Sequence, residues 1–162
     1  MRLPRKVPNL SQLRAMAAEG QYPFAHFFNG ALVSLDAARR VGNVNREFFL
    51  FGEEVDYFFR LRQVGAVVSI LSALHYHPDV SNRPYTLAKV YYYVRNTLVL
   101  NMRYFDLVYL RHLGALAAVL ARTANRNGIS FALSLLIGTG APAFYGAIFK
   151  GLKGQIGKDF NG

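Results

Sequence analysis

Three carboxylates stand within four residues, and they are the side chains in this chain best suited to acid–base chemistry. Glu53, Glu54 and Asp56 follow the aromatic run 48–51 after a single glycine. A buried segment that opens into a cleft would desolvate such carboxyls, and desolvation raises a carboxyl pKa, as general-base chemistry requires. Glu54 is the first candidate base and Glu53 the second, because Glu53 lies nearer the helix start and Asp56 can pair with Arg60. The alternative is an acidic first turn that only complements the helix dipole, worth roughly a few tenths of a kcal/mol per charge.

Two histidines form the second candidate site. His75 and His77 flank Tyr76, after an apolar β-branched run and before a polar loop. Either imidazole could ligate a divalent metal together with carboxylates, although the pattern is too short to name the metal. The alternative is that both histidines are structural.

A third group of polar residues lies in an aromatic helix. Arg95 could contact a phosphate, and Asn96 follows it. The tyrosines at 91–93 point in three directions on a helix, so they predict a packing layer rather than one stacking platform. Upstream, Asn29 precedes Gly30, a residue that lets the backbone come close to a ligand.

The elements expected to position these residues change character near residue 83. The first part predicts short helices that alternate with apolar, β-rich runs, and the second part is nearly all helix. We therefore expect two domains, 1–83 and 84–162, and an α/β fold followed by a helical C-terminal region. The expected helices are 12–19, 35–41, 53–64, 84–105 and 107–122, and the expected strands are 24–34 and 66–74.

Composition limits the classes of protein that the chain can belong to. The 162 residues are 52% hydrophobic and 17% charged, which excludes a disordered chain. There is no cysteine, so disulfides, thiolate catalysis and cysteine-ligated zinc are excluded. Nineteen basic and nine acidic residues give a net charge of +10, which favours a polyanionic partner. The basic N-terminus has no apolar segment behind it and is not a secretory signal.

One segment near the C-terminus could meet a membrane. Residues 129–149 carry no formal charge over 21 positions, and basic residues stand on both sides. About 20 apolar residues suffice to cross a bilayer, but glycine, serine and proline dilute this segment. A helical hairpin that lies in the membrane interface is the favoured interpretation, and a true span is the alternative.

The motifs in this order resemble the C-terminal half of family 2 glycosyltransferases, the inverting enzymes with the nucleotide-sugar-binding GT-A fold. The bacterial rhamnosyltransferase and galactofuranosyltransferase groups are the most similar. The resemblance covers about residues 24–105, and the combination of motifs is more specific than any one of them. The matching residues are 28–34, 41–42, 48–49, 53–57, Arg60, Gly65, His77, Tyr92, Tyr93, Arg95 and Asn96.

The resemblance implies a partial GT-A-like, Rossmann-like sheet and a set of roles. Glu54 matches the general base that deprotonates the acceptor hydroxyl. His77 matches a histidine that joins a divalent metal, Mg²⁺ or Mn²⁺, in some members. Asp56 and Arg60 match positions that hold the helix. The residues expected to bind acceptor or donor sugar are Asn29, Gly30, Asp56, Arg95 and Asn96.

Three departures from the family pattern matter. The family usually has Asp at the position of Glu54, and the extra methylene moves the base by more than about 1 Å, which can be costly. The run before His77 is one residue short, which leaves His75 as the alternative ligand. No Asp-x-Asp metal signature and no glycine-rich phosphate loop occur in the chain. We therefore expect the acceptor-side half of a glycosyltransferase, a fragment that is inactive alone.

The resemblance implies a nucleotide-sugar donor and a lipid-linked glycan or polysaccharide acceptor, with the chain peripheral on the cytoplasmic face of the inner membrane. The basic residues among the apolar C-terminal helices favour an anionic membrane as a further partner. Because the charge is spread along the chain and no recognition motif occurs, we expect no nucleic acid to be bound. Two alternatives from other classes remain. The charge and ten tyrosines could suit a basic nucleic-acid-binding module, and residues 129–149 could anchor a small membrane-embedded structural protein.

Overall fold

The structure is a computed structural model that describes residues 9–24, 30–74, 76 and 83–160. The chain divides into two compact units, and each contains a segment from another part of the sequence. Unit 1 consists of Met1–Val44 and Glu54–Pro78. Unit 2 consists of Asn45–Glu53 and Asp79–Gly162.

Unit 1 contains short elements with a small apolar core. Its elements are α1 (Leu10–Met16), β1 (Gln21–Tyr22), α2 (Leu35–Val41), most of α3 (Glu53–Arg62) and β2 (Ser69–Ile70). Helix α2 has the predicted bounds, because the Ser34 side chain caps its first turn and Gly42 follows its last residue at φ 77°. Helix α1 begins and ends earlier than the predicted range 12–19, and the Asn9 side chain caps its first turn.

The predicted α/β fold is wrong for the described residues. They contain seven helices and a single two-stranded antiparallel sheet, in which Gln21 pairs with Ile70. The β-branched run 66–74 was predicted to be a buried strand, but only Ser69–Ile70 is paired, and Ile70 is 46% exposed. A buried strand needs neighbouring strands that pair with its edges and other elements that cover its two faces. An apolar run cannot supply either of these by itself.

The predicted strand 24–34 is also not observed among its described residues. Residues 25–29 lie outside the described part of the chain, and residues 30–34 have no strand pairing. Leu32 is fully exposed in this stretch. The apolar core of unit 1 instead gathers on α3, where Tyr57, Phe58 and Leu61 are buried.

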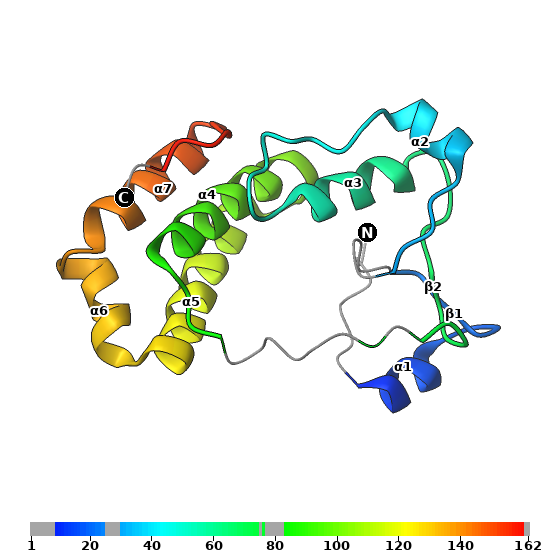
Figure 1. The fold of residues 1–162 in the computed structure, drawn as a ribbon, viewed down its shortest axis with the longest axis horizontal. Helices are drawn as coiled ribbons and strands as arrows, with labels where there is room; N and C mark the ends of the chain where they lie inside the picture. Colours follow the sequence, from blue (N-terminus) through cyan, green and yellow to red (C-terminus); the bar gives the residue numbers. More distant parts are fainter. Residues whose placement is uncertain (1–8, 25–29, 75, 77–82, 161–162) are drawn as a thin grey trace. The chain divides into compact units, whose positions relative to one another are not determined.

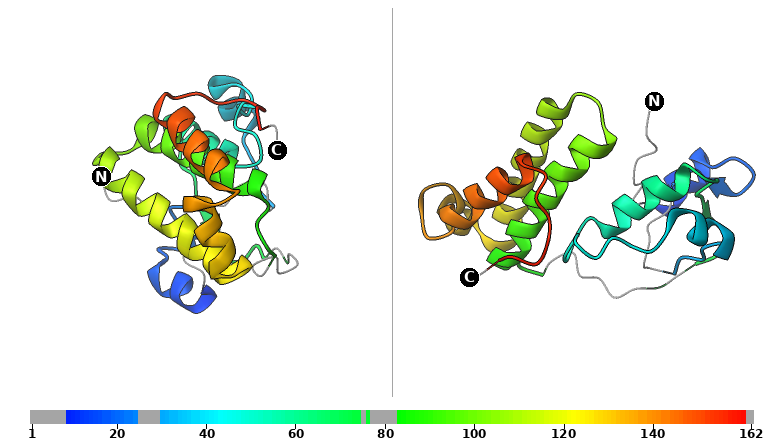
Figure 2. Two further views of the ribbon diagram at one scale, coloured as in Figure 1. Left: turned by 90° about the vertical axis from the view of Figure 1, so that its left-hand side faces the viewer. Right: turned by 90° about the horizontal axis from the view of Figure 1, so that it is seen from above.

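Unit 2 is a layered set of four helices. They are α4 (Leu87–Tyr104), α5 (Val108–Asn127), α6 (Ile129–Ile137) and α7 (Ala141–Leu152). Helix α4 packs against α5 and α7, and α6 packs against α5 and α7, as Figures 1 and 2 show. A Cβ at Gly151 would lie 3.0 Å from the Arg95 carbonyl oxygen, so the missing side chain lets α7 approach α4 closely.

The helices of unit 2 agree with the sequence pattern in kind and differ at their ends. Helix α4 begins at Leu87 because the Thr86 side chain caps it, and α5 runs on to Asn127 before Gly128 at φ 90° ends it. The uncharged segment forms α6 and α7, which are bent by 65° at the break between them.

No single helix among the described residues is long and apolar enough to cross a membrane. The bent pair of α6 and α7 is long and apolar enough only when its two helices are taken together.

Candidate functional site

The acidic cluster occupies the first turn of α3. Glu53 and Glu54 are both partly buried, and Asp56 is 2% exposed. Two residues in the left-handed region form the turn before the helix, Leu50 at φ 66° and Gly52 at φ 97°. Such a turn needs outside support when one of its residues is not glycine.

Arg60 anchors α3 within unit 1. Its Nε donates to Asp56 Oδ2 at 2.9 Å, which confirms the predicted pair. Nη1 donates to the Val41 carbonyl at 2.8 Å, and Nη2 donates to the Asn43 carbonyl at 3.0 Å. The end of α2 is therefore tied to the acidic helix by one planar side chain, which presents its donors in a rigid fork. This geometry gives Asp56 and Arg60 a positioning role.

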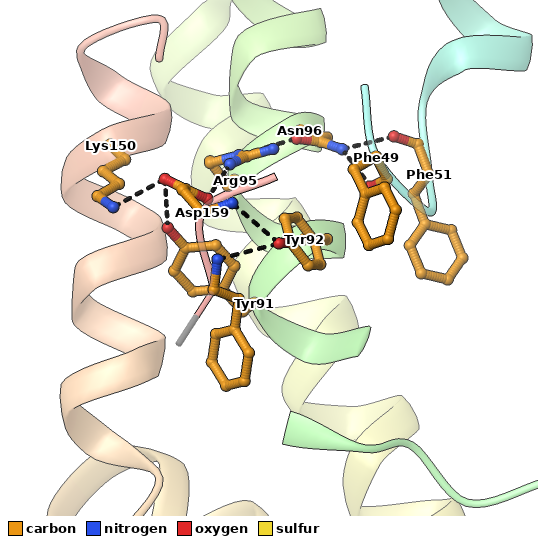
Figure 3. Close-up of polar contacts among 9 residues, drawn as sticks. Phe49, Phe51, Tyr91, Tyr92, Arg95, Asn96, Lys150 and Asp159 are labelled. Atoms are coloured by element: carbon orange, nitrogen blue, oxygen red, sulfur yellow. Dashed lines mark hydrogen bonds and ion pairs between the residues drawn. The ribbon is translucent and has the colours of Figure 1, made fainter. Parts of the chain in front are cut away.

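Asn96 supports the turn that leads into the acidic cluster, and its partners lie within unit 2. Its Nδ2 donates to the carbonyls of Phe49 at 3.2 Å and Phe51 at 2.6 Å (Figure 3). A Cβ at Gly52 would lie 3.1 Å from Leu100 Cδ1, so the backbone passes directly over α4. The buried amide of Asn96 thus fixes the backbone that ends immediately before Glu53.

Arg95 connects the same helix to the C-terminal segment. Its side chain has no exposed surface, and its Nη1 donates to Asp159 Oδ1. Its Nε donates to Asn96 Oδ1 at 3.0 Å, which orients the amide that holds the turn. Arg95 Nη2 has no hydrogen-bond partner among the described residues, but the guanidinium lies 4.9 Å from the centroid of the Tyr92 ring.

Asp159 is the centre of this polar network (Figure 3). Besides Arg95, its carboxylate accepts from Lys150 Nζ at 2.7 Å and from the Tyr91 hydroxyl at 3.1 Å. Its backbone N–H donates to the Tyr92 hydroxyl at 3.1 Å. Tyr91 and Tyr92 are both buried, so the predicted packing layer is confirmed, and their hydroxyls also hold the C-terminal segment.

The network shifts the pKa of two of its members, Asp159 and Lys150. Burial alone would raise the pKa of Asp159, but the hydrogen bond from Lys150, the charge of Arg95 and the hydrogen bond from Tyr91 outweigh it and lower that pKa. The hydrogen bonds of Lys150 to Asp159 and Tyr91 raise the pKa of Lys150. Both shifts favour the charged forms of Asp159 and Lys150.

The other predicted site residues divide into two groups. Asn29, His75 and His77 lie outside the described residues, and Gly30 is exposed at φ 83°. Within the described ranges, no group of three histidine or acidic side chains could hold a metal ion. Arg95 and Asn96 contact protein groups that explain their burial, and their binding of a sugar stays a prediction.

Asp159 is the important residue that the sequence reasoning missed. Its partner Arg95 is 64 residues away, and no periodic pattern links such positions. A usable signal was present, since Asp159 is the only acidic residue after Asp106, in a region with many cations. A lone carboxylate in such a region is expected to form an ion pair.

Comparison with known proteins gives no relative: no family model, no curated protein and no solved structure matches the chain.

Proposed function

We propose that this chain carries the acceptor-activating part of an inverting glycosyltransferase. The observation that supports the proposal most is the support of the acidic turn of α3 from both sides along the chain. Asn96 holds the backbone before Glu53, and Arg60 holds the helix after Glu54. A general base must be held close to its working position, and each of these contacts restrains the backbone beside the acids within its own unit.

The chemistry assigned to the turn is a single displacement. The Glu54 carboxylate takes the proton of the acceptor hydroxyl as its oxygen attacks the anomeric carbon of the donor sugar. The bond between that carbon and the nucleoside diphosphate breaks on the opposite face, so the configuration inverts and the diphosphate leaves with the bonding electrons. Glu53, one residue earlier, is the alternative base.

The substrates follow from the resemblance in the motifs. The donor is a nucleotide sugar, and the acceptor is a lipid-linked glycan or a polysaccharide, reached on the cytoplasmic face of a bacterial inner membrane. The described residues supply only β1 and β2, so a donor-binding sheet would have to come from another segment or polypeptide. The purified chain, incubated with nucleotide sugars, Mn²⁺ and a lipid-linked acceptor, is expected to transfer nothing. Robust transfer would contradict the dependence on a second part.

A chimera tests the proposal itself. Residues 24–105 replace the matching segment of an active family 2 transferase, and far-UV circular dichroism verifies that the product folds. We expect sugar transfer that is lost in Glu54→Gln and kept in Glu47→Gln, a matched control in the loop before the turn. A folded chimera in which both variants transfer at the parent rate would refute the role of Glu54. Saturation-transfer NMR of acceptor glycans on the unmodified chain gives an independent readout.

A further inference from the structure

Helix α6 has an apolar outer face. Ile129, Leu133 and Ile137 are exposed and recur every four residues, so they share one side of the helix. Ile137 is 88% exposed. Ala132 and Leu135 are buried on the inner side, where α6 packs against its neighbours.

Helix α7 repeats this arrangement. Tyr145, Phe149 and Leu152 are each at least half exposed, and their spacing places them on one side. Phe144 and Ala147 are buried on the opposite side, where α7 packs against α4. The two helices follow one another along one side of α4 and α5 (Figures 1 and 2), so their outer faces point away from the rest of unit 2.

The charges around these faces all have one sign. No aspartate or glutamate occurs from Leu107 to Lys158, and six arginines and lysines do. Lys153 Nζ lies 4.1 Å from the centroid of the exposed Phe149 ring, which places a cation directly beside the apolar face. A second copy of the chain would bring the same cations together, and they would repel. An anionic lipid surface complements both the apolar faces and the cations.

The dimensions favour docking in the plane of the membrane. Helix α6 has 9 residues and α7 has 12, which correspond to lengths of about 14 Å and about 18 Å. Each is well short of the roughly 30 Å hydrocarbon core, and the bend of 65° keeps them from forming one straight rod.

We propose that α6 and α7 dock in the interface of an anionic bilayer, with their outer faces among the acyl chains and Lys153 at the headgroups. This inference deepens the proposed function, because it names the helices that bring the chain to a membrane-bound acceptor. The delivery to an acceptor rests on the proposed function. The docking itself rests on the exposed faces and on the distribution of charge.

Tryptophan fluorescence tests the docking directly, because the chain has no tryptophan of its own. Ile137→Trp reports the outer face of α6, and Leu32→Trp, at a fully exposed position of unit 1, is the control. With vesicles of phosphatidylcholine and phosphatidylglycerol, the emission of Ile137→Trp is expected to shift to the blue and to be quenched by lipids brominated near the headgroup. Leu32→Trp is expected to change little, and vesicles of phosphatidylcholine alone are expected to shift neither.

Other outcomes of this experiment overturn the proposal. Equal shifts at both positions would mean unspecific adsorption, and stronger quenching from the bilayer centre would mean a span. A blue shift without vesicles that grows with protein concentration would mean self-association. The absence of a shift at both positions would exclude docking through the outer face of α6.

Co-sedimentation gives a second measurement on the same vesicles. The double variant Ile137→Gln, Phe149→Gln is expected to have a vesicle partition coefficient about tenfold lower than that of the unmodified chain, because two large apolar side chains no longer enter the interface. Leu32→Gln is expected to bind as the unmodified chain does, and undiminished binding of the double variant would contradict the proposal. The chimera with a water-soluble acceptor needs no membrane, so failed docking leaves that test of the transferase intact.

Discussion

The substitution Asp159→Asn probes the network that fixes the C-terminal segment and, through Arg95 and Asn96, the turn before the acidic helix. Asparagine keeps the shape of the side chain but removes the charge that faces a guanidinium with no exposed surface. Removal of one partner of a buried ion pair costs about 3–5 kcal/mol, and we expect about 3 kcal/mol because Asp159 itself is 32% exposed. Urea unfolding followed by far-UV circular dichroism measures this free energy.

The control and the pH dependence make this prediction specific. Asp36→Asn removes an exposed acid in the first turn of α2 and is expected to change the free energy of unfolding by only about 0.5 kcal/mol. Because the pKa of Asp159 is lowered in the folded state, its stabilisation is present above the ordinary value of 3.8 and is lost as the pH falls through the folded pKa. The unmodified chain and Asp159→Asn should therefore converge in acid. A loss below about 1 kcal/mol at neutral pH, the size of an exposed salt bridge, would refute the reasoning.

Three other substitutions test single features. Burial lowers the pKa of His112, so stability should fall as the pH drops from about 7 to about 5, and His112→Gln should remove that dependence in urea unfolding. Asn96→Leu leaves two backbone carbonyls without their donor; it should destabilise unit 2 by about 2 kcal/mol and speed amide hydrogen exchange at Gly52. Arg60→Lys replaces a fork of three donors with one ammonium and should speed exchange along α2 and α3, whereas Arg39→Lys on the exposed side of α2 should not.

Helices with local end signals could be predicted from the sequence. Ser34 and Gly42 define α2, because the cap and the left-handed glycine are interactions within one turn. Thr86 and Gly128 are local signals of the same kind for α4 and α5, but the predictions placed these ends at 84 and 122 and were wrong there. Local signals could not decide whether the run 66–74 forms a strand. An apolar run becomes a strand only when other strands pair with it, and those strands lie elsewhere in the sequence.

The candidate site shows the same division. The Asp56–Arg60 pair was predictable because four residues make one helical turn. The two carbonyls that Asn96 holds lie more than 40 residues away along the chain, and Asp159 is farther still from Arg95. The sequence singled out Arg95 and Asn96 as special, but the contacts that make them so depend on how α4 meets two distant segments.

The most direct test of the central claim is the turnover number of the chimera with Glu54→Gln, measured at saturating donor and acceptor beside Glu53→Gln. If Glu54 is the general base, Glu54→Gln lowers the turnover number by about 10²–10⁴-fold, and Glu53→Gln retains most of the rate. Turnover of Glu54→Gln within a factor of about three of the parent, with the fold intact, would contradict the assignment of Glu54 as the base.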